Sequence, residues 1–270
     1  MNVTRLLGLS VALLTVSGFS QVQPPKKKLL AIGEVKGFEH ESVSHGLATI
    51  EKLGRQTGLW DTYIRTDNEL LTKAKLQNNA KNLDYFDAVI FYTTGDLGLS
   101  DQQKKDLLGS VRDDGKGFLG THSATDTYYN WPEYGELIGA WFNDHPWNQV
   151  HCTIRTEDRT FPATAHFPAS FPFYDEMYQF KEPYSRDKLR VLMSIDPASV
   201  DNNPRVHRAD RDFAVTWVHN YGKGRVFYSS LGHRDEVWDH PDVQKMWIEA
   251  VKWVMGMTEG DVTPRPKPAR

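Results

Sequence analysis

The sequence predicts an α/β protein with a doubly wound, mostly parallel β-sheet and helices on both faces. Apolar runs at 29–35, 85–96 and 117–122 have the continuous hydrophobic character of strands that are covered on both sides. Segments with helical spacing separate these runs, so the chain should form right-handed β-α-β units. The second half contains alternating strands and a tight "NYGKG" turn, which adds a β-hairpin.

The first half is predicted to alternate strands and helices. A second helix is expected after the short strand "WDTYIRTD", with Asp67 as its cap and Leu76 near its end. Ser100 and Gln103 have capping-box spacing at the start of a later helix that stops at Gly115. The elements expected in order are strand 29–35, helix 42–58, strand 60–67, helix 67–76, strand 85–96, helix 100–115 and strand 117–122.

The second half is predicted to be richer in strands. The segments "VHCTIRTED", "LRVLMSID", "FAVTWVHN" and "GRVFYSSLG" have the patterns of strands, and the turn "NYGKG" joins the last two. Before them, Tyr134, Leu137, Ile138 and Trp141 recur at helical spacing and should be core residues. The closing helix "HPDVQKMWIEAVKWVMG" has Pro241 in its first turn.

The two ends of the chain differ from its body. Residues 1–20 have a positive Arg5, an apolar stretch and small residues near a cleavage site, which predicts a secretory signal peptide and export to the periplasm or the outside. A buried N-terminal helix is the alternative. Residues 29–257 then form one domain, and the Pro-rich tail 258–270 is expected to be disordered.

Composition excludes several classes of function. The net charge of −3 over 270 residues gives no argument for binding nucleic acid, and no segment beyond the leader is apolar enough to insert in a membrane. The one cysteine, Cys152, cannot form an intrachain disulfide. It alternates with polar residues on the apolar face of a strand, so we expect a buried and inert thiol.

His122 occupies the tip of a predicted strand-to-helix turn, where many α/β enzymes carry a nucleophile. Gly120 and Ala124 leave the room that such an elbow needs. An imidazole can act there as a general acid or base, or as a metal ligand. A structural histidine that bonds a loop backbone is the simpler alternative.

Other polar residues fall in loops at the carboxyl ends of strands, where ligands of such sheets bind. In "YDEMYQF", Asp175 and Glu176 should point to opposite sides, with Glu176 facing the cleft. Imidazole and carboxylate groups also suit a divalent metal, for which His40, His122 and His145 are candidates. Aromatic loop residues suit pyranose rings, although they could equally be packing residues. The expected substrate-binding set is His40, Asp96, Tyr129, Trp131, His145, Tyr178 and His233.

Taken together, these motifs resemble the ThuA-like (trehalose-utilisation) family. The matching stretches, which span almost all of residues 29–257, are "GFEHES", "DAVIFYTTGD", "GKGFLGTHSATDT", "WPEYGELIGAWFNDHP", "FYDEMYQF" and "VTWVHNYGKGRVFYSSLGH". The resemblance implies a flavodoxin-like fold similar to class I glutamine amidotransferases, with histidine replacing cysteine at the elbow. It implies recurrent family positions at His40, His122, His145, Glu176 and His233. Phe213 departs from the family pattern, which often has histidine there.

The resemblance also implies a role in the metabolism of disaccharides and 3-keto-glycosides. We therefore expect a lyase or hydrolase that acts on such a small-molecule carbohydrate, with His122, Glu176 and Asp175 as catalytic groups and no Cys or Ser nucleophile. A sugar-binding protein without catalysis and a metal-dependent hydrolase are the alternatives. A glutamine amidotransferase is not expected, because Cys152 lies within a strand. No cofactor other than a divalent metal is expected, and an oligomer is left open.

Overall fold

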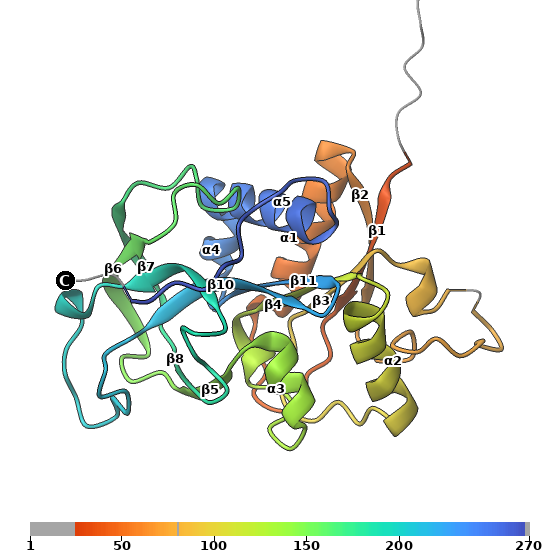
Figure 1. Ribbon diagram of the computed structural model, residues 1–270, viewed down its shortest axis with the longest axis horizontal. Coiled ribbons are helices and arrows are strands. Elements are labelled where there is room, and N and C mark those ends of the chain that lie inside the picture. Colours follow the sequence, from red (N-terminus) through yellow and green to blue (C-terminus); the bar gives the residue numbers. More distant parts are fainter. Residues whose placement is uncertain (1–24, 80, 268–270) are drawn as a thin grey trace, which may run out of the picture.

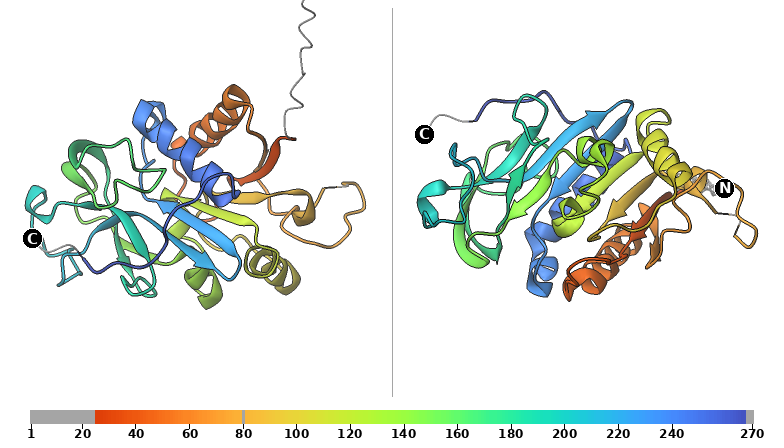
Figure 2. Two further views of the ribbon diagram at one scale, coloured as in Figure 1. Left: turned by 45° about the horizontal axis from the view of Figure 1, so that its top comes forward. Right: turned by 90° about the horizontal axis from the view of Figure 1, so that it is seen from below.

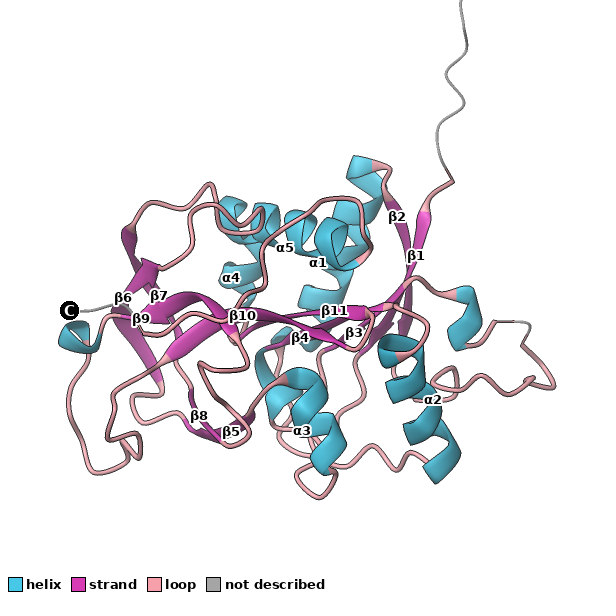
Figure 3. Ribbon diagram, in the orientation of Figure 1, coloured by secondary structure: helices cyan, strands magenta, loops and turns pink. Residues whose placement is uncertain are grey.

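The computed structural model describes residues 25–79 and 81–267, which form a nine-stranded central sheet flanked by helices (Figure 1). The predicted signal peptide, residues 1–20, lies outside this part of the chain. The strand order is β2-β1-β3-β4-β11-β10-β9-β6-β7. A separate two-stranded sheet pairs β5 (Trp141–Asp144) with β8 (Gln179–Lys181) (Figure 3). In the described residues, no helix is long and apolar enough to cross a bilayer.

One half of the central sheet is parallel, as expected for a doubly wound fold. It contains β1 (Lys27–Ile32), β2 (Trp60–Arg65), β3 (Ala88–Phe91), β4 (Gly117–Thr121) and β11 (Gly224–Ser229). All its neighbouring strands run parallel to each other. β3 and β4 are entirely buried because helices cover both of their faces.

The other half is antiparallel, and the sequence predicts its strands less completely than those of the parallel half. It contains β10 (Ala214–Tyr221), β9 (Arg190–Ile195), β6 (Gln149–Thr156) and β7 (Ser170–Glu176). Each successive pair from β11 to β7 is antiparallel. These reversals make β7 run in the same direction as β11, so their carboxyl ends lie at one edge of the sheet. β6 starts at that edge.

Helices form a layer on each face of the sheet (Figures 1 and 2). α1 (Ser42–Thr57), α4 (Asp235–Asp239) and α5 (Pro241–Val254) cover one face, and α2 (Asp101–Arg112) and α3 (Pro132–Ile138) cover the other. The predicted capping box at the start of α2 is present. Each layer buries its own apolar core, with Trp247 and Trp253 on one side and Tyr134 and Phe118 on the other.

The predicted helix from Asp67 to Leu76 is absent. Residues 66–79 form turns and bends instead. Apart from the turn at His122, the described connections contain 3₁₀ helices only at Leu83–Tyr85 and Pro197–Ser199, each of three residues. The backbone N–H of Lys73 and the hydroxyl of Thr72 both donate to Asp106, at 2.7 and 2.8 Å. These tertiary bonds replace the local bonds that a helix would need.

Two further expectations differ from the structure. α3 ends at Gly139, which has φ +95°, so Trp141 lies in β5 and not on the helix. Residues 258–267, expected to be disordered, lie against the antiparallel half. Arg190 donates to Asp261 at 2.7 Å and to the Thr263 carbonyl at 3.0 Å, while Arg265 pairs with Asp158 at 2.7 Å. Charged side chains within the body therefore hold this segment.

Candidate functional site

The elbow after β4 places His122 above the carboxyl edge of the parallel strands. His122 has φ +42° and begins a 3₁₀ helix, His122–Thr125. Histidine is among the residues that adopt this left-handed conformation more readily than most. A Cβ on Gly120 would lie 2.9 Å from the end of Ile138 and 3.3 Å from the Ala124 Cβ, so the glycine makes the tight turn possible. This left-handed turn at the end of β4 is the turn that the sequence predicts, and the His122 ring is buried in it.

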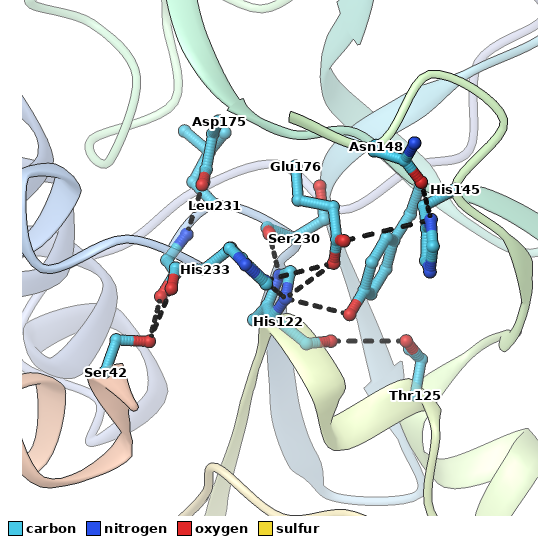
Figure 4. A network of polar contacts seen from close by, with 12 residues as sticks. Ser42, His122, Thr125, His145, Asn148, Asp175, Glu176, Ser230, Leu231 and His233 are labelled. Carbon is cyan, nitrogen blue, oxygen red and sulfur yellow. Dashed lines mark hydrogen bonds and ion pairs between the residues drawn. The ribbon is translucent and has the colours of Figure 1, made fainter. Parts of the chain in front are cut away.

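Hydrogen bonds fix the orientation of the His122 ring (Figure 4). Nδ1 lies 2.7 Å from the carbonyl oxygen of Ser230, which can only accept, so Nδ1 carries the proton. Nε2 of the neutral ring is then a lone-pair acceptor. The Tyr178 hydroxyl donates to it at 2.8 Å, and the two rings stack at 4.4 Å. Nε2 of His122 therefore points into the site, where Tyr178 is its hydrogen-bond donor.

A carboxylate and a second imidazole meet His122 at this lone pair. Glu176 Oε2 lies 3.4 Å from His122 Nε2 and 3.1 Å from His233 Nδ1, and the two nitrogens are 3.3 Å apart (Figure 4). His40 completes the group: its ring centroid lies 4.8 Å from that of His122 and 5.2 Å from that of His233. One donor atom from each of the four residues lies within 4.8 Å of all the others. We call His40, His122, Glu176 and His233 the edge cluster.

The edge cluster has the spacing of a metal site. Four ligands about 2.0–2.1 Å from a zinc ion lie about 3.3–3.4 Å from one another at the corners of a tetrahedron. The three shortest separations in the cluster, 3.1, 3.3 and 3.4 Å, fit such edges. His40 Nδ1 is buried and has no hydrogen-bond partner, so it is available as a ligand. His145, predicted as a metal candidate, is not in this group, and Glu176 and His233 are in its place.

Electrostatics also suits a cation at the edge cluster. Burial, aided by the charges of His122 and His233, lowers the pKa of His40 to about 3, so this ring is neutral. Burial opposes ionisation of Glu176, but the neighbouring His122 and His233 rings hold its pKa well below the usual range. Burial also disfavours a charged His233, yet the Glu176 carboxylate raises the pKa of this ring above its ordinary value. The cluster therefore combines the ionised Glu176 carboxylate with the neutral His40 imidazole.

Several buried groups that the sequence did not reveal hold the loop that carries His233. Ser42 Oγ and Tyr92 Oη are 2.6 Å apart and share a hydrogen bond, and both lie within hydrogen-bond distance of the Gly232 carbonyl oxygen, at 2.9 and 2.7 Å. Trp238 Nε1 donates to the same oxygen at 3.0 Å. No motif marked these residues, because their partner is a backbone carbonyl far along the chain.

Asp175 and Glu176 point to opposite sides of β7, as predicted (Figure 4). Asp175 is fully buried, and its Oδ2 accepts from the Gly232 N–H at 2.7 Å. Burial raises the pKa of this carboxyl. Asp175 thus supports the His233 loop and does not contact His122, so its predicted catalytic role gains no geometric support.

His145 lies at the rim of the site. Its Nδ1 is 3.8 Å from Glu176 Oε1 and 2.8 Å from Asn148 Oδ1. The ring is one-third exposed, which leaves it accessible to a bound molecule. Tyr178 is buried beneath it, with the ring centroids 6.5 Å apart. Both predicted residues therefore belong to the site.

Three predicted residues have other contacts. Asp96 is exposed and accepts from the Gly98 N–H in a local turn. Trp131 is buried at the start of α3 and stacks on Tyr134 at 5.8 Å. Tyr129 donates to Asp126 at 2.6 Å and is not linked to the edge cluster. Core packing engages Trp131 and turn formation engages Asp96, so the geometry gives no support to their predicted roles in substrate binding.

Two residues outside the cluster settle further expectations. Cys152 is buried within β6, and burial raises the pKa of its thiol to about 12, as expected for an inert group. Phe213 is buried edge-on against Trp147 at 4.9 Å. Neither contributes to the site.

The fold and the edge cluster define an α/β protein whose strand–elbow–helix turn presents histidine beside a carboxylate and further imidazoles. More specifically, the chain belongs to the ThuA family, described as trehalose utilisation, whose model matches residues 28–254. No curated protein matches the chain in a sequence comparison.

Solved structures share the fold, among them two of ThuA-like proteins. One from Bacteroides uniformis ATCC 8492 is 21% identical with a TM-score of 0.66, covering 92% of this chain and 95% of its own. One from Parabacteroides merdae ATCC 43184 is 15% identical with a TM-score of 0.68, covering 90% and 93%. A cytoplasmic protein from Salmonella typhimurium LT2 is 15% identical with a TM-score of 0.54, covering 84% and 99%.

Proposed function

We propose that this protein is a metal-dependent enzyme that processes a glycoside or 3-keto-glycoside. The observation that carries the proposal is the triangle of donor atoms from His122, Glu176 and His233, with edges of 3.1–3.4 Å. Family membership supports a carbohydrate substrate, because the family is described as trehalose utilisation. The neutral His40 and the ionised Glu176 support a divalent cation as the occupant.

A bound cation would polarise a carbonyl or hydroxyl oxygen of the substrate and stabilise negative charge on it. A ketone at C3 of a sugar acidifies the neighbouring C2–H. A base removes that proton, the electron pair forms a C1–C2 double bond, and the glycosidic oxygen leaves C1 with a proton from an acid. His145, at the rim and one-third exposed, is the group that we assign to proton transfer. No covalent intermediate is needed, which fits an elbow without Cys or Ser.

Acid–base chemistry without a metal is the second candidate. His122 favours it, because its Nδ1–H bond to Ser230 leaves Nε2 as a base and Glu176 lies 3.4 Å away. In that case His122 and Glu176 themselves move the protons.

One experiment separates the two candidates. The full chain is purified without added chelator, its metal content is measured, and turnover of 3-keto-trehalose is followed before and after treatment with a chelator. The metal proposal expects about one equivalent of metal, loss of turnover on chelation, and recovery when zinc or manganese is returned. Turnover by metal-free protein would refute it and support the acid–base candidate. Absence of turnover with metal bound would leave a sugar-binding role.

Two further points belong to this proposal: the fold is similar to that of class I glutamine amidotransferases, and the protein is exported. The elbow after a parallel strand supports the former, but histidine replaces the nucleophile and Cys152 is buried elsewhere. The leader-like residues 1–20 support export. Fractionation of cells that express the full chain tests the latter: the mature protein should lack residues 1–20 and leave the cytoplasm.

A further inference from the structure

A cavity of about 470 Å³ opens beside the edge cluster. Its volume lies within the range of about 300–1,000 Å³ that is typical of small-molecule sites. His40 and His233 form part of its wall. The remaining lining comes from the loop before α1 and the first residue of that helix, the start of β6, and the first turn of α4 with the residue before it. A molecule in this cavity would therefore lie directly against two candidate metal ligands.

One aromatic ring in the cavity is unusually exposed. Phe38 is 65% exposed, which is the highest exposure among the large hydrophobic residues that are exposed in the described chain. Its ring meets the His40 ring edge-on at 4.8 Å. An apolar ring held open beside a polar cluster offers a platform for the CH face of a sugar.

The rest of the lining is acidic. Glu39, Glu41, Asp235 and Glu236 contribute carboxylates, and Arg234 is the cation among the described lining residues apart from the imidazoles. The Arg234 guanidinium pairs with Glu236 at 2.9 Å and donates to Gln149 at 3.0 Å. The cavity therefore offers acceptors for hydroxyl groups and repels phosphate or carboxylate groups.

We propose that this cavity is a subsite for a neutral, unphosphorylated sugar ring that packs against Phe38 and is hydrogen-bonded by the surrounding carboxylates and Gln149. The ring lies next to His40 and His233, so it presents an oxygen to the edge cluster. This inference names the location and the charge selectivity of the substrate site, and it rests on the proposed function only for the reaction that follows binding.

Calorimetry on the full chain tests the subsite with trehalose and trehalose 6-phosphate as probes. Trehalose should bind, and the phosphate ester should bind at least about tenfold more weakly. Phe38→Ala should weaken trehalose binding by about tenfold. Tyr85→Ala is the matched control, since Tyr85 is an exposed aromatic residue, 39% exposed, outside this cavity, and its loss should leave binding unchanged.

A paired charge variant adds a second measurement. Glu39→Gln with Glu41→Gln should narrow the difference between the two probes, because it removes repulsion of the phosphate. Equal or tighter binding of trehalose 6-phosphate by the unaltered protein, an unchanged affinity in Phe38→Ala, or failure of both probes to bind would overturn the inference. Metal content is measured on the same samples. Selective trehalose binding by protein that holds metal but does not turn over 3-keto-trehalose would count against the proposed chemistry and leave the subsite standing.

Discussion

Tyr178→Phe tests whether a cation occupies the edge cluster. The Tyr178 hydroxyl donates to His122 Nε2 at 2.8 Å, and both side chains are buried. The substitution removes that hydrogen bond and leaves the nitrogen with only the longer contact to His233 Nδ1 at 3.3 Å; loss of a buried hydrogen bond of this kind costs about 1–3 kcal/mol. A domain of this size loses roughly 2–4 °C in Tm per kcal/mol, so we expect a Tm about 2–12 °C lower.

The same substitution should behave differently when metal is bound. A cation uses the Nε2 lone pair that Tyr178 otherwise satisfies, so the hydroxyl competes with the metal. By linkage, the phenylalanine variant should bind zinc about 5- to 150-fold more tightly, the equivalent of about 1–3 kcal/mol. At saturating zinc, the unfolding free energies of the unaltered protein and of the Tyr178→Phe variant should therefore become equal. Denaturation with and without zinc, together with calorimetric titration, measures both quantities.

Tyr228→Phe is the matched control. The Tyr228 hydroxyl is also buried, but it donates to the His122 carbonyl oxygen at 2.7 Å and not to the ring. Its loss should destabilise the protein equally with and without zinc. If Tyr178→Phe behaves like Tyr228→Phe, or weakens zinc binding, the lone pair of His122 is not a metal ligand and the reasoning fails.

Three further predictions concern stability and reactivity. Burial disfavours a charged Asp158, but hydrogen bonds from Thr160 and Arg190 lower the pKa of this carboxyl to about 2. The ionised carboxylate therefore stabilises the fold at pH values above its unfolded pKa, and this contribution is lost as the pH falls through about 2. Asp158→Asn should lose about 2 kcal/mol at pH 7 and show a correspondingly smaller decline between pH 5 and 2; parallel pH profiles of unfolding free energy would contradict this. Burial raises the pKa of Cys152 to about 12, so a thiol reagent at pH 8 should label it only after unfolding, and labelling of native protein at the rate of a free thiol would disprove the assignment. Gly222 has φ +59°, and an added Cβ would overlap the backbone of Arg112. Gly222→Ala should therefore lower the free energy of unfolding, measured by chemical denaturation, by at least about 2 kcal/mol, and a change under about 0.5 kcal/mol would contradict this.

The sequence identified the parts of the fold that depend on local patterns. The buried strands, the capping box of Ser100 and Gln103, and the elbow at His122 all follow from hydrophobic runs, caps and small neighbours. The strand-end rule also placed His40 and His233 at the correct edge, although 193 residue positions separate them in the chain. That rule applies because parallel strands end on the same side whatever their order in the sequence.

Features that depend on distant partners could not be predicted. Asp67 has the sequence context of a helix cap, but the Asp106 carboxylate of α2 accepts a hydrogen bond from the backbone N–H of Lys73. Trp131 has the composition of a sugar platform, but the neighbouring Tyr134 stacks on it. The arrival of Glu176 at the edge cluster required the reversals from β11 to β7, which no periodicity specifies.

The basic C-terminal segment has a consequence for anyone who shortens this protein. Trimming at residue 257, which the Pro-rich composition invites, would remove Asp261 and Arg265. Arg190, 5% exposed, and Asp158, 2% exposed, would each lose a counter-charge while remaining almost enclosed. A version cut after Lys267 keeps these partners and is the better choice for crystallisation or fusion to a reporter.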